Sequence, residues 1–468
     1  SPTTMAGNRG KEFLNTFSIY AIGTIGARLI AFALMPLYTF FLAKDEMGYF
    51  DMSITLIMIM VPFITLDLRD GAFRFLIDKT CPHPQKQVVS YVIRTLLRNC
   101  TIIAIIAAIA YYYLSHLPYY PIIVATLIAY AFYEVMIQVV RGLGHTRFFV
   151  TIGIINTLLV LFFSVIFLVV LKMGVLAIFL ANLLSRIISL IIIETRIHFI
   201  SIYLKHRKEC AKGVGKELLK YTIPLLPNVL AWWLIESSSK IFIVQYLGLE
   251  YNGIFAIAVK FSNILQIAAG IFYQTWQEIA IKEMNSDDSN RFFSKIFNNY
   301  FFFLSSTIVL GTLGLRIIYP YIVAESYQES YIYIYPLFIA VQLHAIGSFL
   351  DLAYQCSRKT HRGLPSIIST AVLAIVLNYF TVTRWGLMGI SASLIISYAY
   401  LMIYRLFDTR FCFRIAPNRL FFSSLLILII GALLAYLPIP TFVIGILFAI
   451  GVVVIGIYAL RILNINKA

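Results

Sequence analysis

The sequence consists of long apolar runs separated by short polar segments. A helix needs about 20 mainly apolar residues to cross the hydrocarbon layer of a membrane. Membrane-spanning strands would instead alternate apolar and polar residues over about ten positions, whereas these runs are continuous. We therefore predict an all-α polytopic membrane protein with about fourteen transmembrane helices. The expected spans are residues 13–41, 49–77, 88–115, 119–141, 148–171, 174–199, 218–247, 251–280, 292–318, 331–355, 364–383, 386–407, 418–437 and 440–462.

Composition supports this class of protein. Hydrophobic residues make up 60% of the chain and charged residues 12%, about half of the charged share of a soluble domain. The high hydrophobicity excludes a disordered chain, and the short connections leave no room for a soluble domain. The opening residues SPTTMAG lack the pattern of a signal peptide. Position 1 is not methionine, so we read Ser1–Thr4 as a processing or tag remnant, with Met5 a plausible true start. We expect the first span to remain in the mature protein.

Basic residues are concentrated in alternate loops. One set of loops carries most of the lysines and arginines, whereas the other holds little beyond Lys44, Lys172 and Arg384. Lysine and arginine are enriched in cytoplasmic loops of membrane proteins. The pattern predicts that both termini are cytoplasmic and accounts for most of the net charge of +16. A nucleic-acid partner is therefore not needed to explain the basic character.

No motif for bond-making chemistry stands out. The cysteines fall in or beside the cytoplasmic loops or, for Cys100, within a span, so we expect no disulfide. No cysteine and histidine spacing suggests zinc. No G-x-x-x-x-G-K-[ST] phosphate loop occurs. We therefore predict a protein that is not an enzyme and that needs no cofactor.

Two pairs of short motifs indicate an internal duplication. LAKDEMGYF (Leu42–Phe50) resembles LGLEYNGIF (Leu247–Phe255), and KMGVLAI (Lys172–Ile178) resembles RWGLMGI (Arg384–Ile390) at a similar offset. An even number of spans separates the copies, so both would have the same orientation, with a binding cavity between two six-helix lobes.

The duplication predicts four segments along the chain. They are an N-lobe at 13–200, a basic cytoplasmic linker at 201–217, a C-lobe at 218–407 and two further helices within 418–462.

Charged residues inside spans are costly and usually face a cavity or a partner. Arg28 lies near the middle of the first span. The second span ends in TLDLRDGAFRFLID, residues 65–78. If this segment is one helix, Asp67, Asp70, Arg74 and Asp78 form one stripe. Asp70 and Arg74 would then form an ion pair, and Arg69 would need another partner or a ligand.

The C-lobe repeats this theme. Glu236 and Lys240 are spaced i, i+4 in the seventh span, and Lys260 lies near the middle of the eighth. Glu134, Asp351 and Arg186, taken with Glu194, add further charges in other spans. Each charged pair could instead serve a structural role by linking two helices. Together the midplane groups are mostly cationic, which predicts an anionic cargo, and guanidinium groups suit phosphate oxygens well.

Aromatic residues and prolines occupy the same helices. Trp232, Trp233, Tyr273 and Trp276 lie on the spans that carry Lys240 and Lys260, where aromatic faces could bind sugar rings or serve as packing and interface anchors. Prolines at 36, 62, 224 and 227 predict bends in spans 1, 2 and 7.

Two stretches resemble a known family. They are ARLIAFALMPLYTFFLAKDEMGYFDMSITL with GAFRFLID after it, and LLKYTIPLLPNVLAWWLIESSSKIFIVQYLGLEYNGIFAIAVKFSNIL. Both are similar to polysaccharide-biosynthesis (O-antigen) flippases of the multidrug/oligosaccharidyl-lipid/polysaccharide exporter superfamily. The resemblance implies two six-helix lobes in a V shape around a central cationic cavity. It also implies that the last two helices help form a groove for a lipid tail.

The resemblance further implies a cargo, undecaprenyl-diphosphate-linked oligosaccharide, flipped from the cytoplasmic to the periplasmic leaflet of the bacterial inner membrane by alternating access. The polysaccharide polymerase and chain-length machinery would be partners. We expect Arg28, Arg69, Arg74, Lys240 and Lys260 to bind the diphosphate. Trp232, Trp233, Tyr273 and Trp276 would contact the glycan, and Asp67, Asp70, Glu134 and Asp351 are the candidates for ion coupling. The cargo's consumption on the far side is an alternative driving force.

Three other functions remain open. A lipid II flippase would use the same mechanism for a peptidoglycan precursor. A cation-coupled drug exporter normally has twelve spans and acidic cavity groups, which fits this chain less well. A membrane-embedded glycosyltransferase would need a large outer loop with an acidic motif, and all the predicted outer loops are short.

Overall fold

The computed structural model describes Gly26, Ile30 and residues 32–77, 83–206, 212–283, 289–356 and 362–465. These residues contain helices and no strand, and ten helical segments among them are long and apolar enough to cross a membrane. One of the ten, Gly363–Phe411, contains the two predicted spans 364–383 and 386–407. The prediction of an all-α polytopic membrane fold is confirmed. Arg28 and Asp78 lie outside the described residues.

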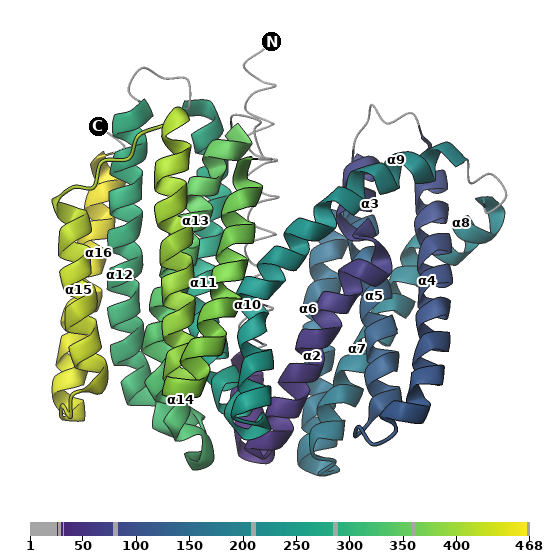
Figure 1. Ribbon diagram of the computed structural model, residues 1–468, viewed down its shortest axis with the longest axis horizontal. Coiled ribbons are helices and arrows are strands. Elements are labelled where there is room, and N and C mark those ends of the chain that lie inside the picture. Colours follow the sequence, from purple (N-terminus) through teal and green to yellow (C-terminus); the bar gives the residue numbers. More distant parts are fainter. Residues whose placement is uncertain are drawn as a thin grey trace. The chain divides into compact units, whose positions relative to one another are not determined.

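The chain divides into two compact units, unit 1 (Ser1–Leu230) and unit 2 (Ala231–Ala468). Figure 1 labels their helices. Unit 1 contains α2 (Lys44–Thr65), α3 (Leu68–Ile77), α4 (Gln85–Leu114), α5 (Tyr120–Gly142), α6 (Thr146–Ser164) with the π-helical turn η1 (Val165–Val170), α7 (Val175–Ile197), α8 (Phe199–His206), α9 (Lys212–Thr222) and the 3₁₀ turn η2 (Ile223–Leu225).

In the rest of the chain, α10 (Leu226–Tyr246) begins at the boundary between the units. It is followed by α11 (Leu249–Glu283), α12 (Ser289–Ile322), the 3₁₀ turn η3 (Glu325–Ser330), α13 (Tyr331–Cys356), α14 (Gly363–Asp408), the 3₁₀ turn η5 (Thr409–Phe411), α15 (Arg419–Tyr436) and α16 (Thr441–Ile465).

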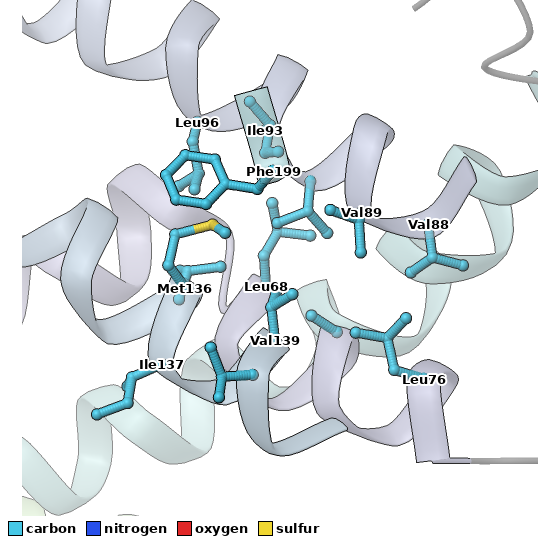
Figure 2. Close-up of a cluster of buried hydrophobic side chains, with 14 of the residues drawn as sticks. Leu68, Leu76, Val88, Val89, Ile93, Leu96, Met136, Ile137, Val139 and Phe199 are labelled. Atoms are coloured by element: carbon cyan, nitrogen blue, oxygen red, sulfur yellow. The ribbon is translucent and has the colours of Figure 1, made fainter. Parts of the chain in front are cut away.

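The hydrophobic core of unit 1 joins helices that are far apart in sequence. Leu68 of α3, Val88 of α4 and Val139 of α5 are fully buried in one cluster, shown in Figure 2. Val214 and Leu218 of α9 are fully buried in the same cluster. Residues 201–217, predicted as a linker, therefore include parts of two helices. The second of them packs on the core of unit 1.

The predicted second span, residues 49–77, is not one helix. α2 ends at Thr65, and Leu66 and Asp67 then adopt left-handed backbone conformations, with φ of 53° and 51°. α3 starts afresh at Leu68. Pro62 lies one turn before the break, and its missing N–H weakens the helix there. The predicted stripe from Asp67 to Asp78 was wrong because it assumed a continuous helical period across this turn.

The internal duplication is visible in the backbone. α2 begins two residues after Leu42, the first residue of its motif, and α11 begins two residues after Leu247, the first residue of the matching motif. In the second motif pair, Gly174 has φ 60° and ψ −144°, and the matching Gly386 has φ 55° and ψ −137°. This region of backbone conformation is essentially restricted to glycine. Two matched positions with the same rare geometry support a duplicated unit.

Gly174 also allows a close approach between two helix ends. The Glu46 carboxylate accepts hydrogen bonds from the backbone N–H of Ala43 at 3.1 Å and of Val175 at 3.3 Å. A Cβ on residue 174 would lie 2.7 Å from Oε1 of Glu46. The glycine therefore lets one carboxylate serve the first turns of both α2 and α7.

We predict that Gly174→Ala lowers the stability of unit 1. The backbone strain alone costs about 1–3 kcal/mol, and the new methyl group displaces Glu46. The matched control is Gly153→Ala in α6, where an added Cβ has no described atom within 4 Å. That control should keep or raise stability, because alanine favours the helix interior by about 0.5–1 kcal/mol over glycine. Thermal unfolding of the detergent-purified variants measures both effects. Equal melting temperatures for the two variants would contradict the prediction.

Candidate functional site

Unit 2 contains a cavity of about 300 Å³, here called the unit 2 cavity. Its wall is built by α10, α11, α12, α13 and α14. The aromatic part of the wall consists of Trp232, Tyr273 and Tyr300. The polar part consists of Gln266, Ser348, Asp351 and Arg405, and small residues complete it at Ala269, Gly270 and Ala345. The wall is thus partly aromatic and partly hydrogen-bonding.

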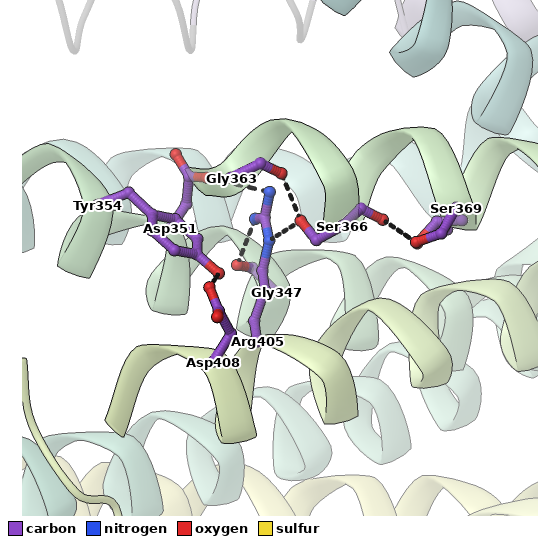
Figure 3. A network of polar contacts seen from close by, with 9 residues as sticks. Gly347, Asp351, Tyr354, Gly363, Ser366, Ser369, Arg405 and Asp408 are labelled. Atoms are coloured by element: carbon purple, nitrogen blue, oxygen red, sulfur yellow. Dashed lines mark hydrogen bonds and ion pairs between the residues drawn. The ribbon is translucent and has the colours of Figure 1, made fainter. Parts of the chain in front are cut away.

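Arg405 is the centre of the polar part and is fully buried. Its Nη1 donates to the carbonyl of Gly347 at 2.8 Å, and its Nε donates to Oγ of Ser366 at 3.1 Å. Its Nη2 lies 3.0 Å from Oδ1 of Asp351, without the alignment of a hydrogen bond. Figure 3 shows these contacts, which tie α13 to both ends of α14. A buried charge needs such a partner set, because its desolvation is costly.

A second carboxylate continues this network toward the ends of the helices. Asp408 accepts a hydrogen bond from the hydroxyl of Tyr354 at 2.7 Å and forms an ion pair with Nη2 of Arg362 at 3.2 Å. The guanidinium of Arg405 lies 5.9 Å from the ring centroid of Tyr354. The charged groups of this part of unit 2 therefore alternate in sign and are compensated locally.

The aromatic part of the wall is held by neighbouring rings. Trp232 contacts His344 edge-on with ring centroids 5.3 Å apart, and the Arg405 guanidinium lies 5.9 Å from the Trp232 ring centroid. Tyr300 stacks on Phe272 at 3.7 Å. Gln266 lies with Nε2 3.2 Å from Nδ1 of His344. These contacts fix the orientation of the rings, so the cavity is preformed.

In unit 1, the turn between α2 and α3 places charges differently from the predicted stripe. Asp70 forms an ion pair with the neighbouring Arg69 at 3.5 Å, and Arg69 also reaches Oε2 of Glu134 on α5 at 3.3 Å. The predicted Asp70–Arg74 pair was therefore wrong. Arg74 instead donates to the hydroxyl of Tyr221 at 3.3 Å and lies over its ring. Arg69, predicted to need another partner or a ligand, is held by two carboxylates.

Asp67 lies inside the turn itself, past the end of the α2 span and before the ten-residue α3. The residue is 5% exposed, and Oδ2 has no hydrogen-bond partner among the described residues. Burial, followed by the charge of Asp70, raises the pKa of the Asp67 carboxyl to about 7, while the charge of Arg69 acts in the opposite direction. The buried position thus favours the protonated form of Asp67.

The interior of unit 1 contains an arginine that the sequence analysis had grouped with Glu194. Arg186 is 7% exposed and donates from Nη1 to the backbone and side-chain oxygens of Asn182, at 2.7 and 3.0 Å. Its guanidinium lies 3.9 Å from the ring centroid of Tyr130, and its Nε has no hydrogen-bond partner in the part of the chain that the structure describes. Glu194 instead accepts from the backbone N–H of Ile200 at 3.2 Å. Arg186 is held by neutral groups.

The remaining predicted residues are dispersed. Lys240 interacts electrostatically with Glu236 on α10, and Lys260 is half-buried on α11. The structure brings Trp232, Tyr273 and Asp351 together at the unit 2 cavity, whereas Trp233 is half-buried elsewhere on α10. The side chain of Trp276 is outside the described residues.

Arg405 was not among the predicted site residues. It lies near the end of the predicted span 386–407, where a basic residue is common. The only local signal was Asp408, three positions later. The described residues contain no group of three or more histidine, cysteine, aspartate or glutamate side chains that could hold a metal ion.

The fold is that of a known class of membrane proteins. No family model and no curated protein matches the sequence. Among solved structures, the lipid II flippase MurJ in an inward closed conformation matches with a TM-score of 0.69 and 16% identity, covering 97% of this chain and 99% of that chain.

Two multidrug exporter structures have a similar fold. A multidrug resistance MATE family transporter of the MOP superfamily, inward-facing, matches with a TM-score of 0.67 and 16% identity over 82% of this chain and 94% of that one. A mutant of the Vibrio cholerae MATE transporter VcmN matches with a TM-score of 0.55 and 12% identity over 90% and 100%. At these identities the likeness establishes the fold. The chain has a multi-pass helical fold similar to that of these transporter structures.

Proposed function

We propose that the protein is a flippase for undecaprenyl-diphosphate-linked oligosaccharide, the repeat unit of a surface polysaccharide. The observation that carries this proposal is the correspondence in fold with a lipid II flippase over 97% of the chain. At this coverage the aligned region must include at least part of the last two helices, α15 and α16. The multidrug transporter with a comparable TM-score covers 82% of the chain. A fold matched over 97% of the chain to a lipid II flippase favours a cargo that likewise joins a lipid to a sugar headgroup.

Interior charge supports an anionic cargo. Arg186 is a buried guanidinium held by neutral groups, and guanidinium groups bind phosphate oxygens through paired donors. We propose that Arg28, Arg69, Arg74, Lys240 and Lys260 neutralise the diphosphate during translocation. Arg69 would exchange its carboxylate partners for phosphate oxygens.

The proposed mechanism is alternating access by movement of helical units. The breaks in the helices supply bending points at Leu66–Asp67 in unit 1 and at the 3₁₀ turn Ile223–Leu225. Asp67, Asp70, Glu134 and Asp351 are the groups through which we propose ion coupling. Of these, Asp67 has the titration range that a proton-driven step requires.

The proposal places the protein in the bacterial cytoplasmic membrane with both termini cytoplasmic, because the basic loops then lie inside. The cargo moves from the cytoplasmic to the outer leaflet, with its polyprenyl tail remaining in lipid. A polysaccharide polymerase and its chain-length machinery would use the product. The protein makes no covalent bond in this scheme and needs no cofactor.

A lipid II flippase is the second candidate function, and the same fold correspondence favours it. The two cargoes share the diphosphate and the polyprenyl chain, and differ in the headgroup. Multidrug export is the third. It is less favoured because an organic cation would be repelled by the buried Arg186 of unit 1, which is held by neutral groups.

We predict that the purified protein in proteoliposomes moves a fluorescently labelled undecaprenyl-diphosphate oligosaccharide from one leaflet to the other. The labelled fraction accessible to a membrane-impermeant reductant measures the movement. Lys260→Ala should slow it at least tenfold, because a half-buried cation is removed from the proposed diphosphate path. Lys295→Ala, an exposed lysine on α12, is the matched control and should leave the rate unchanged.

Labelled lipid II and an organic cation separate the rival functions in the same vesicles. Faster movement of lipid II than of the oligosaccharide carrier would favour the second function. Transport of the cation without movement of either lipid would overturn the flippase proposal.

A further inference from the structure

We infer that the unit 2 cavity is a subsite for one uncharged sugar residue of the lipid-linked glycan. This inference rests on the proposed function and adds to it a place and a chemical specificity. It is carried by three properties of the cavity wall, which are its aromatic surface, its charge balance and the hydrogen-bonding groups that remain available to a ligand.

The size and shape of the cavity suit one small ring. Its volume of about 300 Å³ is at the lower end of the range for ligand pockets, about 300–1,000 Å³. Trp232, Tyr273 and Tyr300 provide flat apolar surfaces, against which the C–H face of a pyranose ring can pack. Gly270 keeps the space open, because a Cβ added there would have no described atom within 4 Å.

The charge balance of the wall excludes strongly charged ligands. Arg405 contributes a positive charge and Asp351, 3.0 Å away, contributes a negative one. A free phosphate would be attracted by Arg405 but repelled by Asp351. An organic cation would be attracted by Asp351 but repelled by Arg405. A neutral ligand avoids both penalties, since burying a charge without a partner is costly.

The hydrogen-bonding groups match a polyol. The guanidinium of Arg405 is fully buried in the wall and lies 3.0 Å from Asp351, so it holds that carboxylate in place. Asp351 is 29% exposed, which leaves its carboxylate accessible as an acceptor for a hydroxyl group. Gln266 and Ser348 add further donors and acceptors. Vicinal hydroxyl groups of a sugar can use an adjacent donor and acceptor together, which a hydrocarbon ring cannot.

Binding of free methyl glycosides to the detergent-purified full-length protein tests the subsite. The probes are methyl glucoside, methyl galactoside and methyl N-acetylglucosaminide, with methyl glucuronide, inorganic diphosphate and tetraphenylphosphonium as charged comparisons. We expect at least one neutral glycoside to bind more tightly than all three charged probes, by calorimetry. Trp232→Leu should weaken that binding at least tenfold, because it removes the flat surface.

Trp385→Leu is the matched control, since Trp385 is 64% exposed on α14 and does not line the cavity. It should leave glycoside binding unchanged. Absence of neutral-glycoside binding by the wild-type protein, preference for a charged probe, or equal loss in both tryptophan variants would overturn the inference.

A second pair of variants fills space instead of removing a contact. Gly270→Leu should block the cavity, whereas Gly445→Leu on α16 makes the same chemical change where an added Cβ also meets no described atom within 4 Å. Gly270→Leu should reduce both glycoside binding and movement of the labelled oligosaccharide carrier at least tenfold, and Gly445→Leu should reduce neither. Comparable melting temperatures of the two variants show that Gly270→Leu folds.

The two proposals fail separately in this experiment. Normal movement of the oligosaccharide carrier by a well-folded Gly270→Leu or Trp232→Leu protein would overturn the subsite and leave the flippase function standing. No movement of the carrier by the wild-type protein would overturn the flippase function. Glycoside binding by the wild-type protein would still report on the chemistry of the cavity.

Discussion

Replacing Arg405 with methionine is expected to destabilise unit 2 by about 3 kcal/mol or more. The fully buried guanidinium contacts the carbonyl of Gly347, the hydroxyl of Ser366 and the carboxylate of Asp351. Methionine has similar length and no donor, so all three contacts are lost while the space remains largely filled. Thermal unfolding of the purified variant and its yield from membranes measure the effect.

Two further variants separate charge from geometry at this site. Arg405→Lys keeps the charge but cannot place three donors in a planar fork, so its stability should fall between wild type and Arg405→Met. Asp351→Asn should cost less in the Arg405→Met background than alone, because the two side chains are coupled. Arg410→Met, at an exposed arginine in η5, is the control and should change stability by about 0.5 kcal/mol or less. Wild-type stability of Arg405→Met would show that the network is dispensable.

The sequence was sufficient to predict the helices, because hydropathy alone determines which segments can enter a membrane. Predicted spans such as 119–141 and 418–437 coincide with α5 and α15 within a few residues. The duplication could also be recognised in the sequence, because Gly174 and Gly386 occupy positions whose backbone conformation is essentially restricted to glycine. These features depend on local chemistry, which sequence patterns record directly.

The charged contacts were not predictable in the same way. Asp70 and Arg74 do lie four residues apart on α3, but Asp70 pairs with the adjacent Arg69, and Arg74 donates to Tyr221 of α9. The left-handed turn that removes Asp67 from the predicted stripe has no periodic signature. The Arg405 network joins residues up to 58 positions apart on two helices, so no spacing rule could reveal it. The first residues of α9 were predicted as part of the linker 201–217, because charged residues surround the buried Val214. Tertiary packing decides these contacts.

The second large effect concerns the pH dependence of stability at Asp67. In the unfolded chain the carboxyl has its ordinary pKa of 3.8, whereas in the folded protein burial and Asp70 raise the pKa to about 7. Between these values the folded state binds a proton that the unfolded state lacks. Stability therefore falls as the pH rises from about 4 to about 7 and is constant above that range. The full difference amounts to at most about 4 kcal/mol.

Asp67→Asn should remove this dependence, because asparagine carries no charge at any pH and tolerates the left-handed backbone that residue 67 adopts. At pH 8 the variant should melt at a higher temperature than wild type, and at pH 4 the two should melt together. Asp70→Asn is the matched control, since Asp70 is 55% exposed and paired with Arg69; it should lower the slope of stability against pH only slightly, by weakening the repulsion of Asp67.

If proton uptake at Asp67 also drives translocation, the Asp67→Asn variant will be more stable at pH 8 and insensitive to an imposed pH gradient in proteoliposomes. Gain of stability with an unchanged response to the gradient would instead assign Asp67 a purely structural role.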